Sequence, residues 1–128
     1  MKGEQFIAEV KNLAELDSNE DTQKTVRATL ETLRERLAGN EPADLAAQLP
    51  PEIAPFVEGT GGREAFSVQE FYERVAHKEG TKSEEAVKHA RAVATVVHTA
   101  VTGGALEDVR SQLGADYEEL FGQTGSST

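Results

Sequence analysis

The feature that most constrains the fold is an internal duplication with an offset of about 64 residues. Polar residues, helix-ending glycines and apolar residues recur together at this offset. The matched pairs are Glu20 with Glu84, Lys24 with Lys88, Arg27 with Arg91, Ala28 with Ala92, Gly39 with Gly103, Asp44 with Asp108, Gln48 with Gln112 and Leu49 with Leu113. Before this block, one extra residue of offset aligns Phe6 with Phe71 and Val10 with Val75. We therefore expect two copies of one unit of about 60 residues.

Apolar residues recur at spacings of three and four, which is typical of amphipathic α-helices, and no segment alternates with period two as a strand would. The longest stripes are Val26, Leu30, Leu33 and Leu37 in the first copy and Ala86, Ala90, Val93, Val97 and Val101 in the second. A shorter stripe, Phe6, Val10 and Leu13, predicts the first helix. Both copies are therefore expected to be helical throughout.

Capping residues indicate where helices begin. Ser18, Ser67 and Ser83 are predicted N-caps, and Ser67 with Glu70 forms a capping box. Shorter helices are expected over residues 43–49, 52–57, 106–113 and 116–121. Glycine and proline pairs separate these segments from the longer helices.

These elements predict an all-α fold, a bundle of about eight helices formed by two pseudo-twofold-related repeats that share one core. We place a single domain at 1–122, with repeat one at 3–58, a linker at 59–66 and repeat two at 67–122, followed by a disordered tail at 123–128. Two independent bundles are the alternative. They are less favoured because each half alone would bury too little surface to be stable.

The net charge is −10, from 23 acidic and 13 basic residues. Such a charge repels phosphate backbones and anionic lipids, so we expect no nucleic-acid and no membrane partner. Solubility explains the charge most simply, and adaptation to high salt is the alternative. The chain has no cysteine, no apolar segment that could span a membrane and no secretory-signal pattern, which together predict a cytoplasmic protein.

Three segments resemble a recognised family: LRERL at 33–37, ADLAAQLP at 43–50 and GGALEDVRSQL at 103–113. They are similar to the uncharacterised bacterial and archaeal family called domain of unknown function 2267 (DUF2267), whose final LF is matched by Leu120 and Phe121. In two places the chain departs from the family pattern. Gly114 replaces a proline, and Gly61-Gly62 stand where members often carry tryptophan. The resemblance implies an all-α fold and brings no established biochemical function.

No residue pattern indicates catalysis. His77, His89 and His98 lack the spacings of zinc-protease and di-iron motifs, and His89 and His98 are expected on opposite helix faces. Glu73 and Glu85 each precede a histidine by four residues, which predicts pairs on helix surfaces. Nucleophile elbows and phosphate-binding glycine loops are also absent from the sequence. We therefore expect no catalytic residue, no metal, no cofactor and no enzymatic activity.

The duplicated polar residues Arg27, Gln48, Arg91 and Gln112 are the candidate ligand or partner site. One interpretation is structural: Arg27 would hold the short helix through Asp44, and each glutamine would bond the end of a neighbouring helix. The other is that these groups converge at the pseudo-twofold axis and bind a small anion or a partner's backbone, as arginine side chains do well. Loss of stability on substitution to alanine would favour the structural interpretation.

The leading functional hypothesis is a non-enzymatic helical protein–protein interaction module with a stress-related or regulatory role, and its partner would be another protein. It predicts an exposed apolar strip, for which the candidates are Ile7, Leu16, Ile53, Tyr72 and Val96. The alternative is a small-molecule or anion-binding protein, or an enzyme, that uses the cleft between the repeats, lined by Arg27, Arg91 and Gln112. The sequence does not predict an oligomeric state.

Overall fold

The fold is known from a computed structural model, which describes residues 1–101 and 103–121. The α-helices in these ranges are α1 (Gly3–Ala14), α2 (Asn19–Arg36), α3 (Glu41–Ala46), α4 (Val68–Glu79), α5 (Ser83–Ala100), α6 (Gly103–Gln112) and α7 (Glu118–Phe121). Two 3-10 helices, η1 (Ala54–Phe56) and η2 (Ala115–Tyr117), complete the regular structure. No strand occurs among the described residues, so the prediction of an all-α fold is confirmed. The expected disordered tail at 123–128 lies outside these ranges.

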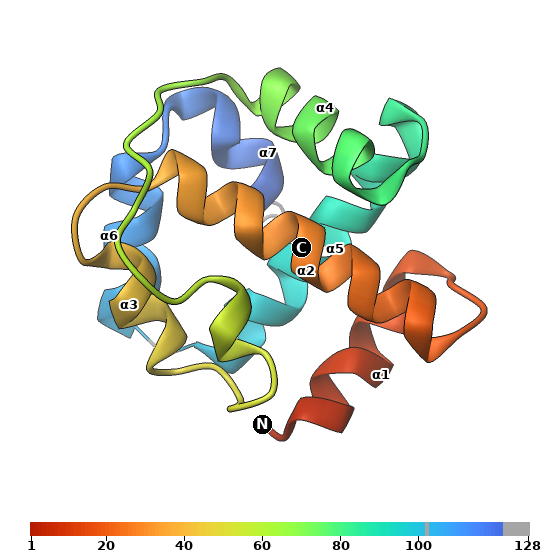
Figure 1. Cartoon of the computed structure of the whole chain (residues 1–128). Helices are drawn as coiled ribbons and strands as arrows, with labels where there is room; N and C mark the ends of the chain where they lie inside the picture. The colour runs from red at the N-terminus through yellow and green to blue at the C-terminus, as the bar shows by residue number, and fades with distance from the viewer. Residues whose placement is uncertain (102, 122–128) are drawn as a thin grey trace, which may run out of the picture.

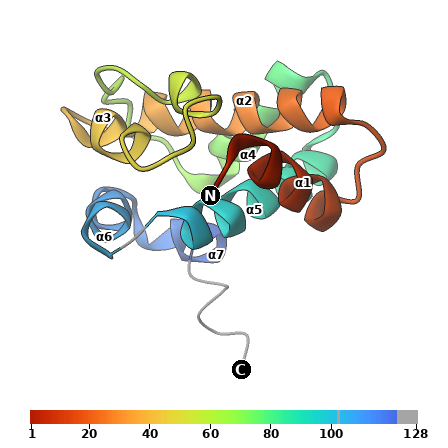
Figure 2. The ribbon, with the colours of Figure 1, turned by 90° about the horizontal axis from the view of Figure 1, so that it is seen from below.

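The two long helices, α2 and α5, cross near the centre of the molecule (Figure 1). Helix α1 packs on both of them, and so does α4. Figure 2 shows α2 and α3 in one layer and α5 and α6 in the other, with α3 packed on α6. The buried apolar side chains form one continuous core. None of the helices in the described ranges is long and apolar enough to cross a membrane.

The expected stripes explain why the long helices form this core. Every residue of the two longest stripes, on α2 and α5 with their final members just beyond, is buried. Ser18 Oγ accepts a hydrogen bond from the Asp21 amide (3.0 Å), and Ser67 Oγ accepts one from the Glu70 amide (3.2 Å), as predicted. The prediction for Ser83 was wrong. Ser83 is the first residue of α5, and Lys82 occupies the cap position without a side-chain bond.

The short helices differ from the predicted ones in type and extent. The segment expected at 52–57 contains only the 3-10 turn η1, because Pro55 removes an amide donor there. The helix expected at 106–113 begins earlier, at the start of α6. The helix expected at 116–121 is divided into η2 and α7.

The apolar surface of α1 is also placed differently. Leu13 was expected in the core but is 49% exposed, whereas Ala14 is buried, so the stripe runs at a spacing of four through Phe6, Val10 and Ala14.

The prediction of an exposed apolar strip formed by Ile7, Leu16, Ile53, Tyr72 and Val96 was wrong as well. Leu16 is half-buried and the other four are buried. For Ile7 and Tyr72 the reason is that α1 and α4 each pack on two helices, so their buried faces are wider than a single stripe.

The linker at 59–66 is bonded to the end of α2. The amides of Gly61, Gly62, Arg63 and Glu64 donate in turn to the carbonyls of Gly39, Arg34, Leu37 and Glu35, at 2.9–3.1 Å. A Cβ atom on Gly61 would overlap the Leu37 carbonyl oxygen, and one on Gly62 would lie 2.8 Å from the Glu35 carbonyl oxygen. The glycine pair therefore allows two backbone segments to lie in contact.

Candidate functional site

The two arginines of the predicted site lie on the long helices. Arg27 on α2 is exposed, and its Nε atom lies 3.0 Å from Glu31 Oε2. The expected clasp between Arg27 and Asp44 is thus replaced by an ion pair along α2. Arg91 on α5 is half-buried, with its Nη2 atom 3.9 Å from Glu119 Oε2.

The two glutamines follow the short helices. Gln112 ends α6, and its Oε1 atom accepts a hydrogen bond from the Ala38 amide (2.9 Å), while its carbonyl accepts one from Arg36 Nη1 (3.3 Å). These bonds hold the end of α6 against the end of α2, which is the contact that the structural interpretation expects of a glutamine. Gln48 lies just beyond α3 and is exposed. Its placement does not distinguish a structural role for Gln48 from a role in binding.

These residues line different hollows. Gln112 lines one together with Arg36 and Arg63, whereas Arg91 lines a groove between α1 and α5. Arg27 and Gln48 line neither. The structure therefore does not gather the four predicted residues into either hollow.

The groove between α1 and α5 has a volume of about 390 Å³. It contains the most exposed large apolar side chain in the described part of the chain, that of Leu13. The other residues that line it are Glu84, Val87, Lys88, Arg91, Ala92 and Thr95. At its edge Lys88 Nζ donates a hydrogen bond to Glu15 Oε1, and this bond lowers the pKa of Glu15 and raises the pKa of Lys88. The groove therefore combines apolar side chains with charged ones of both signs.

Glu85 pairs with His89 as expected, but the pair is not on the helix surface, because His89 is buried. Its Nδ1 atom lies 2.8 Å from Glu79 Oε1, and Glu79 is buried too, while Glu85 Oε1 stays 3.9 Å from Nε2. Gly80, with φ +70°, turns the chain between α4 and α5 and thereby brings the last residue of α4 against His89. Helical spacing cannot indicate such a contact between two helices. Within the described ranges, no group of three His, Cys, Asp or Glu side chains could hold a metal ion.

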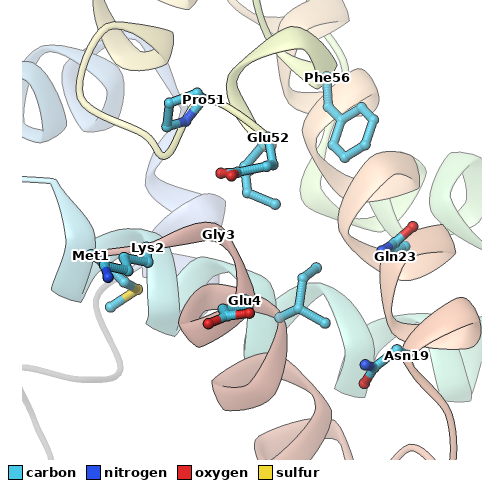
Figure 3. Close-up of a pocket in the computed structure, with 11 residues that line it drawn as sticks. Met1, Lys2, Gly3, Glu4, Asn19, Gln23, Pro51, Glu52 and Phe56 are labelled. Atoms are coloured by element: carbon cyan, nitrogen blue, oxygen red, sulfur yellow. The ribbon is translucent and has the colours of Figure 1, made fainter.

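A larger hollow, of about 700 Å³, lies beside the start of α1 and was not predicted. The beginning of α1, the first turns of α2 and the segment around η1 form its walls. Glu52 and Phe56 approach it from one side, and Glu4 and Asn19 lie opposite (Figure 3). Its size is in the range of small-molecule sites. No sequence motif indicated it, because its walls come from residues up to 55 positions apart.

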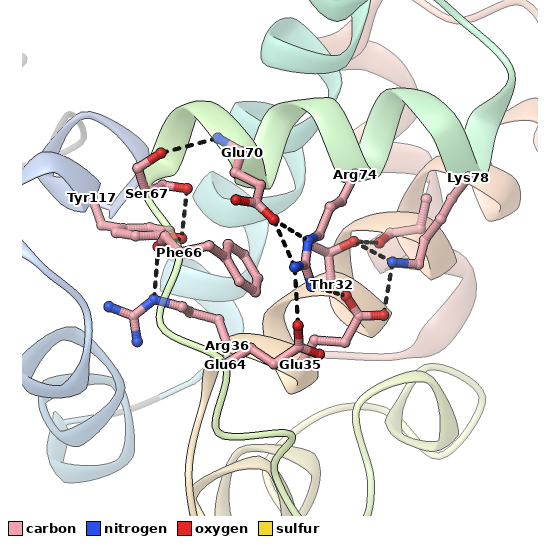
Figure 4. A network of polar contacts seen from close by, with 11 residues as sticks. Thr32, Glu35, Arg36, Glu64, Phe66, Ser67, Glu70, Arg74, Lys78 and Tyr117 are labelled. Carbon is pink, nitrogen blue, oxygen red and sulfur yellow. Dashed lines mark hydrogen bonds and ion pairs between the residues drawn. The ribbon is translucent and has the colours of Figure 1, made fainter.

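The densest polar network is centred on Arg74 of α4 (Figure 4). Its guanidinium donates to Glu35 Oε1 on α2 (3.0 Å), to Glu64 Oε1 in the linker (3.0 Å) and to Glu70 Oε2 on α4 (2.6 Å). It also lies over the ring of Phe66, 3.9 Å from the centroid. One side chain thus joins α2, the linker and α4.

Lys78, one turn further along α4, completes the network. Its Nζ atom donates to Glu35 Oε2 (2.9 Å) and to Thr32 Oγ1 (3.0 Å). Burial of Glu35 favours its neutral form, but the hydrogen bonds and positive charges of Lys78 and Arg74 outweigh this effect and lower the pKa of Glu35. Glu70, Arg74 and Lys78 recur every four residues, a signal of a charged helix face that the sequence does contain. Nothing in the sequence identifies Glu35 as their shared partner.

The chain is similar to a known protein family. A family model described as "Uncharacterized conserved protein (DUF2267)" matches residues 3–120. No curated protein matches the sequence. The match covers nearly the whole chain and agrees with the resemblance found in the sequence.

Proposed function

We propose, from the premise that this chain belongs to the DUF2267 family of uncharacterised conserved proteins, that it is a non-enzymatic helical module that binds another protein in the cytoplasm. A stress-related or regulatory role is part of this proposal.

We also infer that the molecule consists of two repeats related by a pseudo-twofold axis. Helices α1 and α4 both have 12 residues, and α2 and α5 both have 18. The offset from Asn19 to Ser83, where the long helices begin, is that of the sequence duplication. Each repeat's first helix packs on the long helix of the other repeat, so the two repeats would share one core.

The observation that carries the binding proposal is the exposure of Leu13. Its side chain is 49% exposed in the groove between α1 and α5, beside the half-buried Val87. An apolar side chain flanked by a groove suits the apolar face of a partner helix.

The charges at the groove bear on which side chains such a partner presents. Lys88 bonds Glu15, Arg91 Nη2 lies 3.9 Å from Glu119 Oε2, and Glu84 also lines the groove, so both cations have acidic neighbours within the chain. We therefore propose a helical partner segment that contacts the groove chiefly through an apolar anchor on Leu13.

Affinity capture from native cell extract tests this proposal. The wild-type chain, Leu13→Glu and Asn12→Glu are compared, because Asn12 is an exposed neighbour outside the groove and the substitution adds the same charge. We expect a discrete protein to be retained by the wild type and Asn12→Glu and lost from Leu13→Glu. Retention of the same proteins by both variants would contradict the proposal. The proposal would also be contradicted if Leu13→Glu only prevented the chain from associating with itself.

A second candidate function is binding of a small molecule. The hollow of about 700 Å³ favours it. This hollow lies within residues 1–56, away from the cleft between the repeats that the sequence suggested and from Arg27, Arg91 and Gln112. A thermal-shift screen against metabolites and anions tests this candidate, because a ligand that binds only the folded chain raises its melting temperature.

A further inference from the structure

The residues that line the hollow beside α1 have counterparts in the second half of the chain, at the offsets of the duplication. Ile7 on α1 and Ile53, next to η1, both line it. At the offset of 65 residues that relates α1 to α4, Ile7 corresponds to Tyr72. At the offset of 64 that relates the following segments, Ile53 corresponds to Tyr117. These two positions hold the only tyrosines of the chain.

In the second half, both tyrosine side chains are buried and donate hydrogen bonds to residues of other segments. Tyr117 Oη donates to the carbonyls of Phe66 (2.8 Å) and Ser67 (3.1 Å), the two residues that precede α4, and its ring packs edge-on against Phe71. Tyr72 Oη donates to Glu119 Oε2 on α7 (2.7 Å). The first half has isoleucine at both positions, so neither the rings nor these hydrogen bonds exist there.

A carboxylate lies at the corresponding place in both halves. In the second half Asp116 Oδ2 accepts a hydrogen bond from the amide of Val68, the first residue of α4 (2.7 Å). The corresponding residues in the first half are Glu52 and Gly3, and the Glu52 carboxylate lies directly against Gly3. The Glu52 carboxylate, just before η1, thus lies against the start of α1, as the Asp116 carboxylate of η2 lies against the start of α4.

The acceptors that Tyr117 uses also have counterparts at the hollow. Phe66 and Ser67 correspond to Met1 and Lys2, which both line it. The Lys2 carbonyl accepts the amide of Phe6 (2.9 Å), as the Ser67 carbonyl accepts the amide of Phe71 (3.0 Å) while it also accepts Tyr117 Oη. A carbonyl oxygen has two lone pairs, so the Lys2 carbonyl retains capacity for a hydroxyl donor.

We propose that this hollow binds a phenolic ring, which takes the place that tyrosine side chains occupy in the second half. The ring packs on Ile7 and Ile53 beside Phe56, and its hydroxyl donates to the carbonyls that precede α1. This inference rests on the two-repeat architecture and on the second candidate function above. It identifies the ligand class and leaves open whether the phenol is a free molecule or a tyrosine side chain.

Titration of the isotope-labelled full chain, followed by amide chemical shifts, tests the proposal. One arm uses 4-ethylphenol and the other N-acetyltyrosine amide, so that the arm with the higher affinity identifies the source of the ring. We expect saturable shifts centred on the amides of Ile7, Gln23 and Ile53. Ethylbenzene and N-acetylphenylalanine amide, which lack the hydroxyl, should bind at least about tenfold more weakly.

Ile7→Tyr is the matched blocking variant, because it places the second half's own residue in the hollow. We expect it to abolish the shifts, whereas Asn12→Tyr, at an exposed position of the same helix outside the hollow, binds as the wild type does. Absence of phenol-induced shifts in the wild type would overturn the proposal whatever the variants do. So would shifts that persist in a folded Ile7→Tyr chain. If another compound from the thermal-shift screen shifts the same amides and the phenols do not, the phenolic class is wrong while the second candidate function stands.

Discussion

Thr25 and His89 meet in the core, where Thr25 Oγ1 lies 3.4 Å from His89 Nδ1. The two residues are 64 positions apart, which is the offset of the duplication, so the same position of α2 and of α5 contacts its own counterpart where these helices cross. Contact between equivalent positions is what a twofold relationship produces at its axis. Under the proposed two-repeat architecture, the axis passes between these two side chains.

The pairing of His89 with Glu79 predicts a large stability effect. His89→Ala removes the imidazole 2.8 Å from a carboxylate that is 7% exposed, and leaves that carboxylate buried without its partner. We expect the free energy of unfolding, measured by denaturant titration, to fall by about 3 kcal/mol. His98→Ala on the same helix, at a half-buried position, should cost less than about 1 kcal/mol. Equal effects of the two substitutions would contradict a stabilising role for this pair.

The glutamine at the end of α6 should behave as a structural clasp. Gln112→Ala removes the acceptor of the Ala38 amide, so we expect a loss of about 1–2 kcal/mol in the free energy of unfolding. Arg27→Ala breaks only an ion pair whose arginine side chain is 65% exposed, and should change stability by less than about 0.5 kcal/mol. If Arg27→Ala destabilised the chain as much as Gln112→Ala, our assignment of Arg27 to the surface of α2 would be wrong.

The linker glycine should not tolerate a side chain. Gly61→Ala places a methyl group onto the Leu37 carbonyl oxygen, and the backbone must move apart to relieve the overlap. We expect a loss of at least about 2 kcal/mol, read from thermal or denaturant unfolding. Gly104→Ala is the matched control, because its methyl group meets nothing within 4 Å and helix propensity favours alanine by up to about 1 kcal/mol. An unchanged stability for Gly61→Ala would show that the linker does not pack as described.

The Arg74 network predicts a dependence of stability on pH. Because the folded-state pKa of Glu35 is lowered, its carboxylate contributes stability that is complete above the unfolded-state pKa. This contribution is lost as the pH falls through the folded-state pKa. Glu35→Gln should therefore be less stable than the wild type at pH 7, and the difference should shrink below about pH 4.

Unfolding midpoints measured between pH 3 and 7 check this. Glu73→Gln, at an exposed position of α4, serves as the control and should follow the wild type across the range. A difference between Glu35→Gln and the wild type that grew on acidification would refute the expected sign.

The all-α fold and the starts of α2 and α4 were readable in the sequence. The stripes of α2 and α5 repeat every three or four residues, and a helix with such a stripe must bury it. Ser18 and Ser67 bond the amides three residues further on, so local chemistry alone identified these two caps. Ser83 was misleading because a serine one residue inside a helix looks the same in the sequence as one at the cap.

Only the tertiary structure decided which residues meet. The burial of Ile7 and the exposure of Leu13 depend on how many helices pack on α1. The spacing of apolar residues within α1 does not reveal that number. The contacts of His89 with Glu79 and of Arg74 with Glu35 depend on where helices cross and how the chain turns between them. The sequence by itself determined the helices and the duplication, because spacing and capping act within a few residues. The core, the network and the hollow beside α1 follow from packing between residues far apart in the chain, whose geometry exists only once the helices are assembled.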